Sequence, residues 1–540
     1  MKCGKYDGVP ARNEEAGFEW GTLKVDSMGF IKATDDEVLI ANKSLSWWES
    51  EYGFPLHIIY SPILIENIQR FKHVFETYYP QGHIRFAGKV NAHPTIFRLI
   101  AKEGVGADVA SLNEMKAALQ GGMNPEDLDI NGNAKSDALI HTGIQLNSFF
   151  IADSYEELKN IHQIAEYLGK QARVALRIAG FSMDNVTDAN IFTAGIWSKF
   201  GENLNNVPEI IDTLHEFPYL DFQGFHSHIG SQITDPEPYY MALGKLIEFG
   251  HLLNQKGGHC RVINIGGGFP AEYVNKSEWD YLVNRVKTGY TAGQHGDYTQ
   301  AFVWNNEHGG LAVQNDGTIN PEIWSGEKMY SKYPREKMLE KVLTGEVTVH
   351  NQKKSVQQAL QELGNPKLVI EPGRSMAEDS GLTLVKVSHV RPVAGNHQLT
   401  TVEANVTNFS TAMLLPPVNH WTILNNPYHT DKQPFETFLA GNLCYSGDII
   451  SKYKVFLQRK PRRGDILACY NTGAYDPSFF AANTNSFPRP ARILTDEYGV
   501  IDIIKKRDTY EDIFSVEERL PLEYNQLKNS SIQRVEYHDK

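Results

Sequence analysis

Lys89 is the residue whose surroundings first suggest chemistry. It lies in the short apolar run 85–91 (RFAGKVN), which has turn-forming residues on both sides. Lysine is seldom fully buried without a partner, so a lysine in a predicted buried strand needs an explanation. Its amine either reaches solvent from the strand end or is a desolvated nucleophile that forms a Schiff base. By itself the run favours the first interpretation, because one residue type carries little motif information.

Two segments far from Lys89 supply groups that suit a phosphate and a ring nitrogen. The triple glycine 266–268 lets backbone N–H groups approach a phosphate with no Cβ in the way, and Arg374 adds a bidentate cation. Glu371 is an acid that can pair with a pyridine nitrogen. A flexible turn is the alternative for the glycines, but both segments end predicted strands, where phosphates commonly bind. Together with Lys89, these groups predict pyridoxal 5'-phosphate as the cofactor.

A pair of histidines lies in another predicted strand. His226 and His228 are two residues apart, so both face the same side of the strand. A metal site is conceivable, but no cysteine or carboxylate run offers further ligands at a recognisable spacing. The four cysteines are widely separated and form neither a disulfide framework nor a ligand cluster. We therefore predict no metal site and interpret the pattern as an aromatic ring stacked on a planar cofactor.

The elements that must position these groups alternate in type from residue 55 onward. Amphipathic segments typical of helices separate eight short apolar runs, at 85–91, 106–111, 127–133, 148–154, 173–179, 222–229, 262–268 and 367–373. Such alternation predicts right-handed parallel β-α units. An open, doubly wound sheet is the alternative, and the count of eight favours a closed (β/α)8 TIM-like barrel. The two segments predicted to bind the phosphate and the ring nitrogen then lie at the ends of strands seven and eight.

We predict three parts for this α/β chain. Residues 1–55 form an N-terminal segment that completes a β domain, and residues 56–380 form the barrel. The stretch 271–366 is longer than one crossover and predicts an insertion on the active-site side, where loops vary most freely. Residues 381–540 form a C-terminal β-rich domain with a polar tail.

Charge and hydropathy exclude several classes of partner. Lys and Arg number 52 against 65 Asp and Glu, a net charge of −13, which argues against nucleic-acid and anionic-membrane surfaces. No apolar run is long enough for a membrane span, and residues 1–7 lack the apolar core of a signal peptide. We expect a cytoplasmic enzyme that acts on a small molecule.

Ten short motifs in order along the chain give a specific resemblance. They are FAGKVN (86–91), GVGADVAS (104–111), NGNAKSD (131–137), LRI (176–178), SKFG (198–201), FHSHIGSQ (225–232), INIGGGFP (263–270), EPGR (371–374), NLCYSGD (442–448) and GAYDPS (473–478). Jointly the chain resembles the fold-type III pyridoxal-phosphate decarboxylases, the group of diaminopimelate and ornithine decarboxylases.

The resemblance implies a role for each matching residue. Lys89 is the Schiff-base lysine, with Asp108 near it, and His228 stacks on the pyridine ring. Glu371 keeps the ring nitrogen protonated, which favours decarboxylation over the racemisation catalysed by relatives with an arginine there. The phosphate ligands are Ser231, Gly267, Gly268, Arg374 and Tyr475.

One further residue implies an assembly. Cys444 resembles the cysteine that the partner subunit contributes in these decarboxylases, where it or a nearby group returns a proton to the substrate carbon. The resemblance thus implies a homodimer with active sites at the subunit interface.

Departures from the family pattern concern the substrate. Tyr445 stands where diaminopimelate decarboxylases have glutamate and ornithine decarboxylases have aspartate, and a tyrosine carries no charge near neutral pH. The arginine expected near residues 410–413 for a distal carboxylate is absent. We predict an amino-acid substrate other than diaminopimelate, bound by Tyr445, Arg374 and the insertion.

Two other classes stay open. A racemase or epimerase on the same scaffold would exchange the α-proton without releasing CO2. A non-catalytic relative that acts as a binding protein is disfavoured, because Lys89, Glu371, Arg374 and Cys444 are all present.

Overall fold

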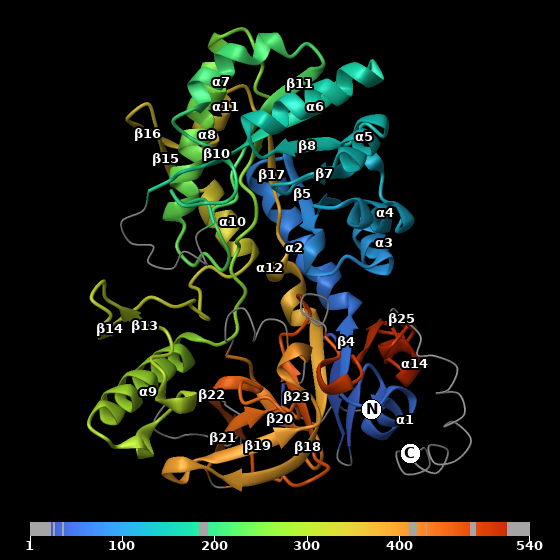
Figure 1. Ribbon diagram of the computed structural model, residues 1–540, viewed down its shortest axis with the longest axis vertical. Helices are drawn as coiled ribbons and strands as arrows, with labels where there is room; N and C mark the ends of the chain where they lie inside the picture. Colours follow the sequence, from blue (N-terminus) through green and yellow to red (C-terminus); the bar gives the residue numbers. More distant parts are fainter. Residues whose placement is uncertain are drawn as a thin grey trace, which may run out of the picture.

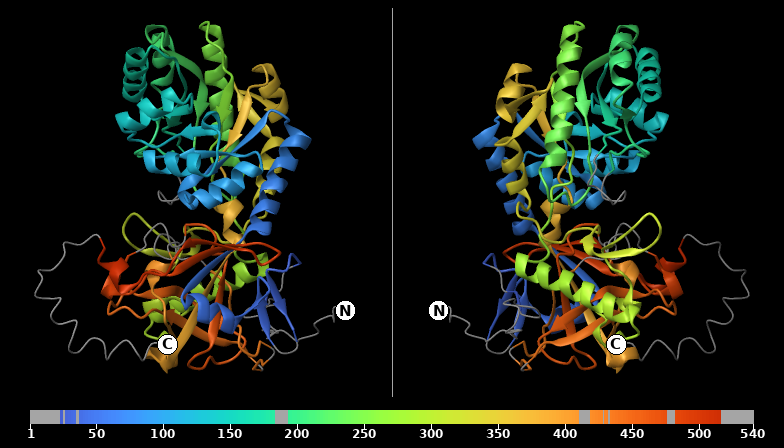
Figure 2. Two further views of the ribbon diagram at one scale, coloured as in Figure 1. Left: turned by 90° about the vertical axis from the view of Figure 1, so that its right-hand side faces the viewer. Right: turned by 90° about the vertical axis from the view of Figure 1, so that its left-hand side faces the viewer.

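The computed structural model describes residues 23–24, 27–34, 37–182, 193–409, 418–427, 429–431, 433–475 and 482–515. Two bodies lie one above the other, a barrel surrounded by helices and a β-rich domain, with α12 (Arg374–Ala377) between them (Figure 1). The views turned by 90° show the same two bodies (Figure 2).

Eight parallel strands form the barrel. In spatial order they are β9 (Ala172–Ala179), β11 (Leu220–His226), β12 (Val262–Asn264), β17 (Lys367–Ile370), β5 (Gly82–Ala87), β6 (Gly106–Val109), β7 (Leu128–Ile130) and β8 (Phe149–Ala152). Pairing of β8 with β9 closes the barrel, and the two-residue β10 (Glu202–Asn203) lies beside β9. Each strand coincides with one of the eight apolar runs, so the predicted barrel is confirmed.

Helices cover the outside of the barrel between successive strands. They are α2 (Ser61–Tyr78), α3 (Pro94–Lys102), α4 (Leu112–Gln120), α5 (Asp137–Gln145), α6 (Tyr155–Leu168), α7 (Val207–Thr213), α8 (Glu237–Gln255), α10 (Glu336–Leu343) and α11 (Val356–Glu362). Ser111, Ser136 and Ser154 begin α4, α5 and α6, each accepting a hydrogen bond from the third helical N–H. Such caps satisfy a donor that the helix leaves free, so they fix the turns after three strands. Among the described helices, none is long and apolar enough to span a membrane.

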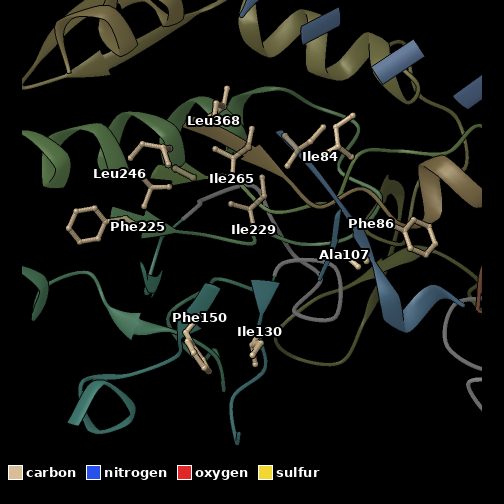
Figure 3. Close-up of a cluster of buried hydrophobic side chains, with 14 of the residues drawn as sticks. Ile84, Phe86, Ala107, Ile130, Phe150, Phe225, Ile229, Leu246, Ile265 and Leu368 are labelled. Atoms are coloured by element: carbon tan, nitrogen blue, oxygen red, sulfur yellow. The ribbon is translucent and has the colours of Figure 1, made fainter. Parts of the chain in front are cut away.

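The barrel core consists of side chains from its strands and from the helices around them. Figure 3 shows part of it, including Phe86, Phe150 and Phe225, which are completely buried. Alternate residues of each strand point to opposite faces, so one set fills the barrel while the other meets the helices. This packing holds the strand ends in place, and the candidate site lies there.

A second sheet forms the β domain. Its order is β22 (Ile449–Leu457), β21 (Phe435–Ala440), β19 (Gln398–Val402), β18 (Gly381–Pro392), β4 (Leu56–Tyr60), β24 (Ala491–Thr495) and β25 (Ile501–Lys505). β23 (Ile466–Tyr470) pairs with β18 and with β20 (Trp421–Ile423). β4 lies between β18 and β24, so the boundary predicted at residue 56 falls one strand too early. The apolar strand β4 directly precedes α2, and the sequence pattern alone does not show whether it pairs in the barrel or in the β domain.

The described part of the N-terminal segment packs on this domain. It contains β1 (Ile31–Ala33), β2 (Val38–Ile40), β3 (Lys43–Ser44) and α1 (Leu45–Tyr52). The three strands form a small sheet of their own, and Trp48 shares an apolar cluster with β4 and β18. Near the other end of the described chain, α14 (Tyr510–Ile513) follows β25.

The long stretch between β12 and β17 divides into two parts. Residues 336–362 contain α10, the hairpin β15 (Glu346–Val349) and β16 (Gln352–Ser355), and α11, whose apolar residues belong to the barrel core. Residues 271–335, which we call the inserted segment, contain α9 (Lys276–Gln294), β13 (Leu311–Val313) and β14 (Ile319–Trp324). Its two ends meet where the N–H of Arg335 donates to the carbonyl of Pro270 at 2.8 Å.

Most of the inserted segment packs on the β domain. In Figure 1, α9 lies beside β21 and β22, and the β13–β14 hairpin lies above α9. Leu282 and Phe302 share an apolar cluster with Tyr453 and Phe456 of β22. An ion pair of 2.9 Å joins Arg285 to Glu436 of β21. The segment thus belongs structurally to the second domain while it is connected to the barrel.

Replacing Phe225 by alanine should destabilise the barrel. The side chain is completely buried on β11 with its ring against Phe222 and Phe249, so truncation leaves a cavity costing about 3–5 kcal/mol. Thermal or urea unfolding measures the effect. Tyr167→Ala is the control, because that ring is 85% exposed and its loss should change the free energy of unfolding by less than about 0.5 kcal/mol. Equal effects of the two changes would contradict the assigned core.

Candidate active site

The predicted site residues follow the carboxyl ends of neighbouring strands. Lys89 follows β5, Asp108 lies in β6, and His228, the triple glycine and Glu371 follow β11, β12 and β17. In the sheet order β11-β12-β17-β5-β6 these strands are successive neighbours. The barrel therefore gathers residues that are nearly 300 positions apart in the chain at one rim, where barrel enzymes place their active sites.

Lys89 is not buried in a strand, as its apolar surroundings suggested. β5 ends at Ala87, and Lys89 lies in the following turn η1 (Gly88–Val90) with an exposed side chain. Its neighbours Gly88 and Val90 are buried, and the charge of Lys89 acts on Asp108 and on His228, so the exposed amine lies close to both groups. The site is therefore reached by an amine at the barrel rim.

Asp108 lies beside the lysine turn. Ala87 pairs with Asp108 in the sheet, so the carboxyl group is one strand away from Lys89. Its Oδ1 is buried and has no hydrogen-bond partner among the described residues. Burial and the nearby Glu371 carboxylate raise the pKa of Asp108 well above its usual value, against the attraction of Lys89. The half-buried carboxyl group is thus harder to ionise than an ordinary aspartate.

The pKa of Glu371 is shifted in the opposite direction, although this carboxylate is buried. Asn264 Nδ2 donates to its Oε1 at 2.8 Å, and His226 Nε2 lies 3.2–3.3 Å from the two carboxylate oxygens. Asn131 Nδ2 lies 3.5 Å from the same Oε1. Burial by itself disfavours the charged form, but His226 and the hydrogen bond from Asn264 lower the pKa of Glu371 to about 2. Glu371 is consequently an ionised carboxylate in the barrel centre.

The triple glycine packs against His228 too closely for any side chain. The N–H of Gly267 donates to His228 Nδ1 at 3.0 Å, so this glycine orients the imidazole. A Cβ on Gly267 would collide with the Glu371 carbonyl, and one on Gly268, at φ 87°, would lie 2.6 Å from the Gly230 carbonyl. Burial, with Lys89 and Arg177 nearby, lowers the pKa of His228 well below its usual value. The imidazole is therefore neutral.

Arg374 is buried at the start of α12, and two residues of the inserted segment contact its guanidinium. Its Nη1 donates to the Tyr273 hydroxyl at 2.9 Å, and its Nη2 lies 3.9 Å from Glu327 Oε1. The guanidinium carbon is 5.4 Å from the centre of the Tyr475 ring. Arg374 Nε has no hydrogen-bond partner among the described residues. Because the Tyr475 N–H donates to the Val90 carbonyl at 3.0 Å, this group borders the lysine turn.

These residues fit pyridoxal phosphate on structural grounds. The rim offers an accessible amine, an ionised carboxylate and a buried guanidinium with an unused donor. The glycine loop brings its backbone close to His228 and to the Glu371 carbonyl, where a Cβ would collide. An aldehyde, a pyridine nitrogen and a phosphate are the groups that such a set complements.

Cys444 and Tyr445 do not follow a barrel strand, whereas Ser231 does. Cys444 and Tyr445 are exposed between β21 and β22, where the Cys444 N–H donates to Asn485 Oδ1 at 3.0 Å. Ser231 is half-buried after β11. The stretch 410–413, examined for a missing arginine, lies outside the described residues.

Some residues of the site escaped the sequence analysis. Asn264 was a weak signal, a polar residue inside the apolar run 262–268, and it proves to be a principal partner of Glu371. Arg177 lies in a quoted motif and is buried 3.8 Å from Asp153, with its guanidinium 4.4 Å from the Phe200 ring centre. Tyr273 and Glu327 had no signal, because their contact with Arg374 spans 101 and 47 positions of sequence.

Comparison with known proteins agrees with this geometry. Residues 64–290 match a family model described as the pyridoxal binding domain of pyridoxal-dependent decarboxylases. The diaminopimelate decarboxylase of Methanocaldococcus jannaschii is 27% identical over 474 residues, covering 86% of this chain and 91% of that protein. That of Halalkalibacterium halodurans is 26% identical over 510 residues, covering 92% and 97%.

Solved structures share the two-domain architecture. The diaminopimelate decarboxylase of M. jannaschii superposes with a TM-score of 0.70 at 24% identity, covering 91% of this chain and 98% of that one. The lysine/ornithine decarboxylase of Vibrio vulnificus, in complex with putrescine, gives a TM-score of 0.59 at 18% identity, covering 84% and 97%. At these identities the likeness shows the fold, a barrel with a separate β domain.

The family match and the relatives together indicate what kind of enzyme this is. A chain that carries a pyridoxal binding domain on this barrel is a pyridoxal-phosphate-dependent enzyme. Residues 64–290 therefore carry the pyridoxal binding domain of the pyridoxal-dependent decarboxylases, and over almost its whole length the chain is similar to diaminopimelate decarboxylases, as its motifs indicated.

Gly267→Ala should weaken cofactor binding. The new methyl group meets the Glu371 carbonyl, and relieving such overpacking costs about 1–3 kcal/mol, or about tenfold to a hundredfold in affinity. Titration with pyridoxal phosphate, followed by visible absorbance, measures the change. Gly169→Ala is the control: its Cβ meets nothing within 4 Å, so that variant loses only stability through its φ of 61°. Equal affinities for both variants would contradict the assigned loop.

Proposed function

We propose that the chain decarboxylates an amino acid, with Lys89 as the Schiff-base residue and the α-carboxylate leaving as CO2. The substrate is related to diaminopimelate but differs from it. The observation that carries the proposal is Glu371, an ionised buried carboxylate at the strand end next to the lysine turn. An acid with this low a pKa keeps a proton on a partner nitrogen and not on itself.

Each residue then has a stated task. When bound, pyridoxal phosphate supplies the electron sink that accepts the pair released with CO2. Lys89 would hold the cofactor through its aldehyde, and Glu371 would keep a proton on its ring nitrogen. The imidazole of His228, oriented by the Gly267 N–H, would support the ring. Asp108, whose pKa is raised by burial and by Glu371, would stand beside the lysine.

The phosphate is assigned to the part of the rim formed by the glycine loop and Arg374. Its proposed ligands are Ser231, Gly267, Gly268, Arg374 and Tyr475. Arg374 brings a full positive charge and an unused Nε donor. Since the Gly267 N–H is already directed to His228, the backbone contribution of the loop comes chiefly from Gly268.

The substrate assignment combines the relatives with the departures from them. A structure of the M. jannaschii diaminopimelate decarboxylase contains L-lysine, and that of the V. vulnificus enzyme contains putrescine. These compounds support an amino acid with a basic side chain as the substrate class. Tyr445 offers no charge, and no arginine stands at 410–413, so recognition of a distal carboxylate as in diaminopimelate is not expected.

Cys444 is assigned to the neighbouring subunit's active site. Its exposed position on the β domain leaves it free to enter another copy of the chain, where it would return a proton to the reacting carbon. The proposal therefore includes a homodimer with two shared sites.

A screen of amino acids of both chiralities for CO2 release tests the activity. We expect release from a basic amino acid, and slow or no release from meso-diaminopimelate. Lys89→Ala should abolish release together with the visible absorbance of bound pyridoxal phosphate, while Lys102→Ala on α3 should keep both. α-Proton exchange without CO2 would establish a racemase instead, and family-typical turnover of diaminopimelate would refute the substrate assignment.

Mixing two inactive variants tests the shared site. Cys444→Ala should lower turnover roughly 10²–10⁴-fold, the range for loss of one proton-transfer group, and Lys89→Ala should abolish it. A mixed dimer of the two contains one site with both native residues, so co-expression should restore part of the activity. Cys469→Ala, a change at a buried cysteine of β23, is the matched control, because its homodimer keeps both Lys89 and Cys444 and should retain turnover. No recovery with Lys89→Ala would exclude sharing.

A further inference from the structure

The inserted segment reaches the active site at Arg374. Tyr273 lies near its start and Glu327 near its end, and both contact the guanidinium, at 2.9 Å and 3.9 Å. Tyr273, Glu327 and Arg374 are all buried. The N–H of Tyr273 donates to the Met329 carbonyl at 3.1 Å, so the two ends of the segment lie side by side where they meet Arg374.

Gln232 fastens the same part of the segment to the barrel. Its side-chain amide donates to the carbonyls of Ala271 and Lys328 at 2.6 and 3.2 Å and accepts from the Ala271 N–H at 3.0 Å. Gln232 is buried and directly follows Ser231, a proposed phosphate ligand. The position of Glu327 is thus determined by the barrel as well as by the insertion.

Glu327 changes the charge that Arg374 presents. Two buried carboxylates, Glu327 and Glu378, act on this one guanidinium and favour its charged form. Among the described residues at the rim, Arg177 is already next to Asp153, and Lys89 is assigned to the aldehyde. Since Arg374 is predicted to bind the substrate as well as the phosphate, a second carboxylate on a substrate would meet more acid than base beside it.

We propose that Glu327 is a positioning residue that sets substrate specificity: by neutralising Arg374 it excludes amino acids with a second carboxylate. The inference rests on the proposed function and deepens it. Glu327 acts through Arg374 and does not itself contact the substrate, since its side chain is only 2% exposed. The substrate class is then an amino acid with one carboxylate and a cationic far end.

Binding of L-lysine and meso-diaminopimelate tests this, because the two differ by a single carboxylate. Their dissociation constants for the holoenzyme are read from the change in visible absorbance, without need of CO2 release. The wild-type protein should bind lysine more tightly. Glu327→Gln should shift the affinity ratio toward diaminopimelate by about tenfold or more, the expected effect of removing one buried like charge. Glu327→Asp keeps the charge and should keep the wild-type ratio.

Two further measurements separate specificity from structure. Glu322→Gln makes the same chemical change on exposed β14 of the same segment and should leave the ratio unaltered. The affinity of each apoprotein for pyridoxal phosphate reports on the phosphate ligands. The proposal is overturned if Glu327→Gln changes only cofactor affinity, weakens both ligands equally, or behaves as Glu327→Asp does. Because binding alone is measured, a failure here is distinct from a failure to release CO2.

Discussion

The ionised carboxylate of Glu371 is the interaction on which the site depends. A buried charge without partners is strongly destabilising, and groups following or within three other strands supply the partners: Asn131, His226 and Asn264. These donors converge only when the barrel is closed and each strand is in register. The charge therefore couples the chemistry of the site to the integrity of the fold.

Two buried carboxyl groups at this rim have pKa values displaced in opposite directions. Glu371 has donors on both oxygens and stays ionised, whereas Asp108 has a buried oxygen without a partner and an anionic neighbour. The ionised Glu371 is one cause of the raised pKa of Asp108. Such divergence distinguishes an acid from a base at one site. Here it places a fixed negative charge and a less acidic carboxyl group on adjacent sides of the lysine turn.

The sequence was sufficient for the barrel and for most of its rim, for a physical reason. Buried parallel strands must be short and apolar, and the residues after them stand at one edge, so eight runs locate eight rim positions. The exposure of Lys89 depends on a turn that apolar neighbours conceal, and the sheet that takes up β4 depends on distant pairing with β18 and β24. Glu327 could not be found in this way, because its contact with Arg374 depends on how the whole inserted segment folds back onto the barrel.

The position of an acidic group matters as much as its presence. The resemblance implies an acid at the place of Tyr445, and in this chain that place is on an exposed loop, where water and salt screen a charge. Glu327 is buried beside Arg374, where screening is weak and a single charge acts on everything bound nearby. An acid at the latter position also lies within the same chain as Lys89, so its effect does not depend on the approach of a second subunit. In this protein the charge near the far end of the substrate is therefore set within one chain. The inserted segment, which connects the β domain to the barrel rim, places Glu327 beside Arg374.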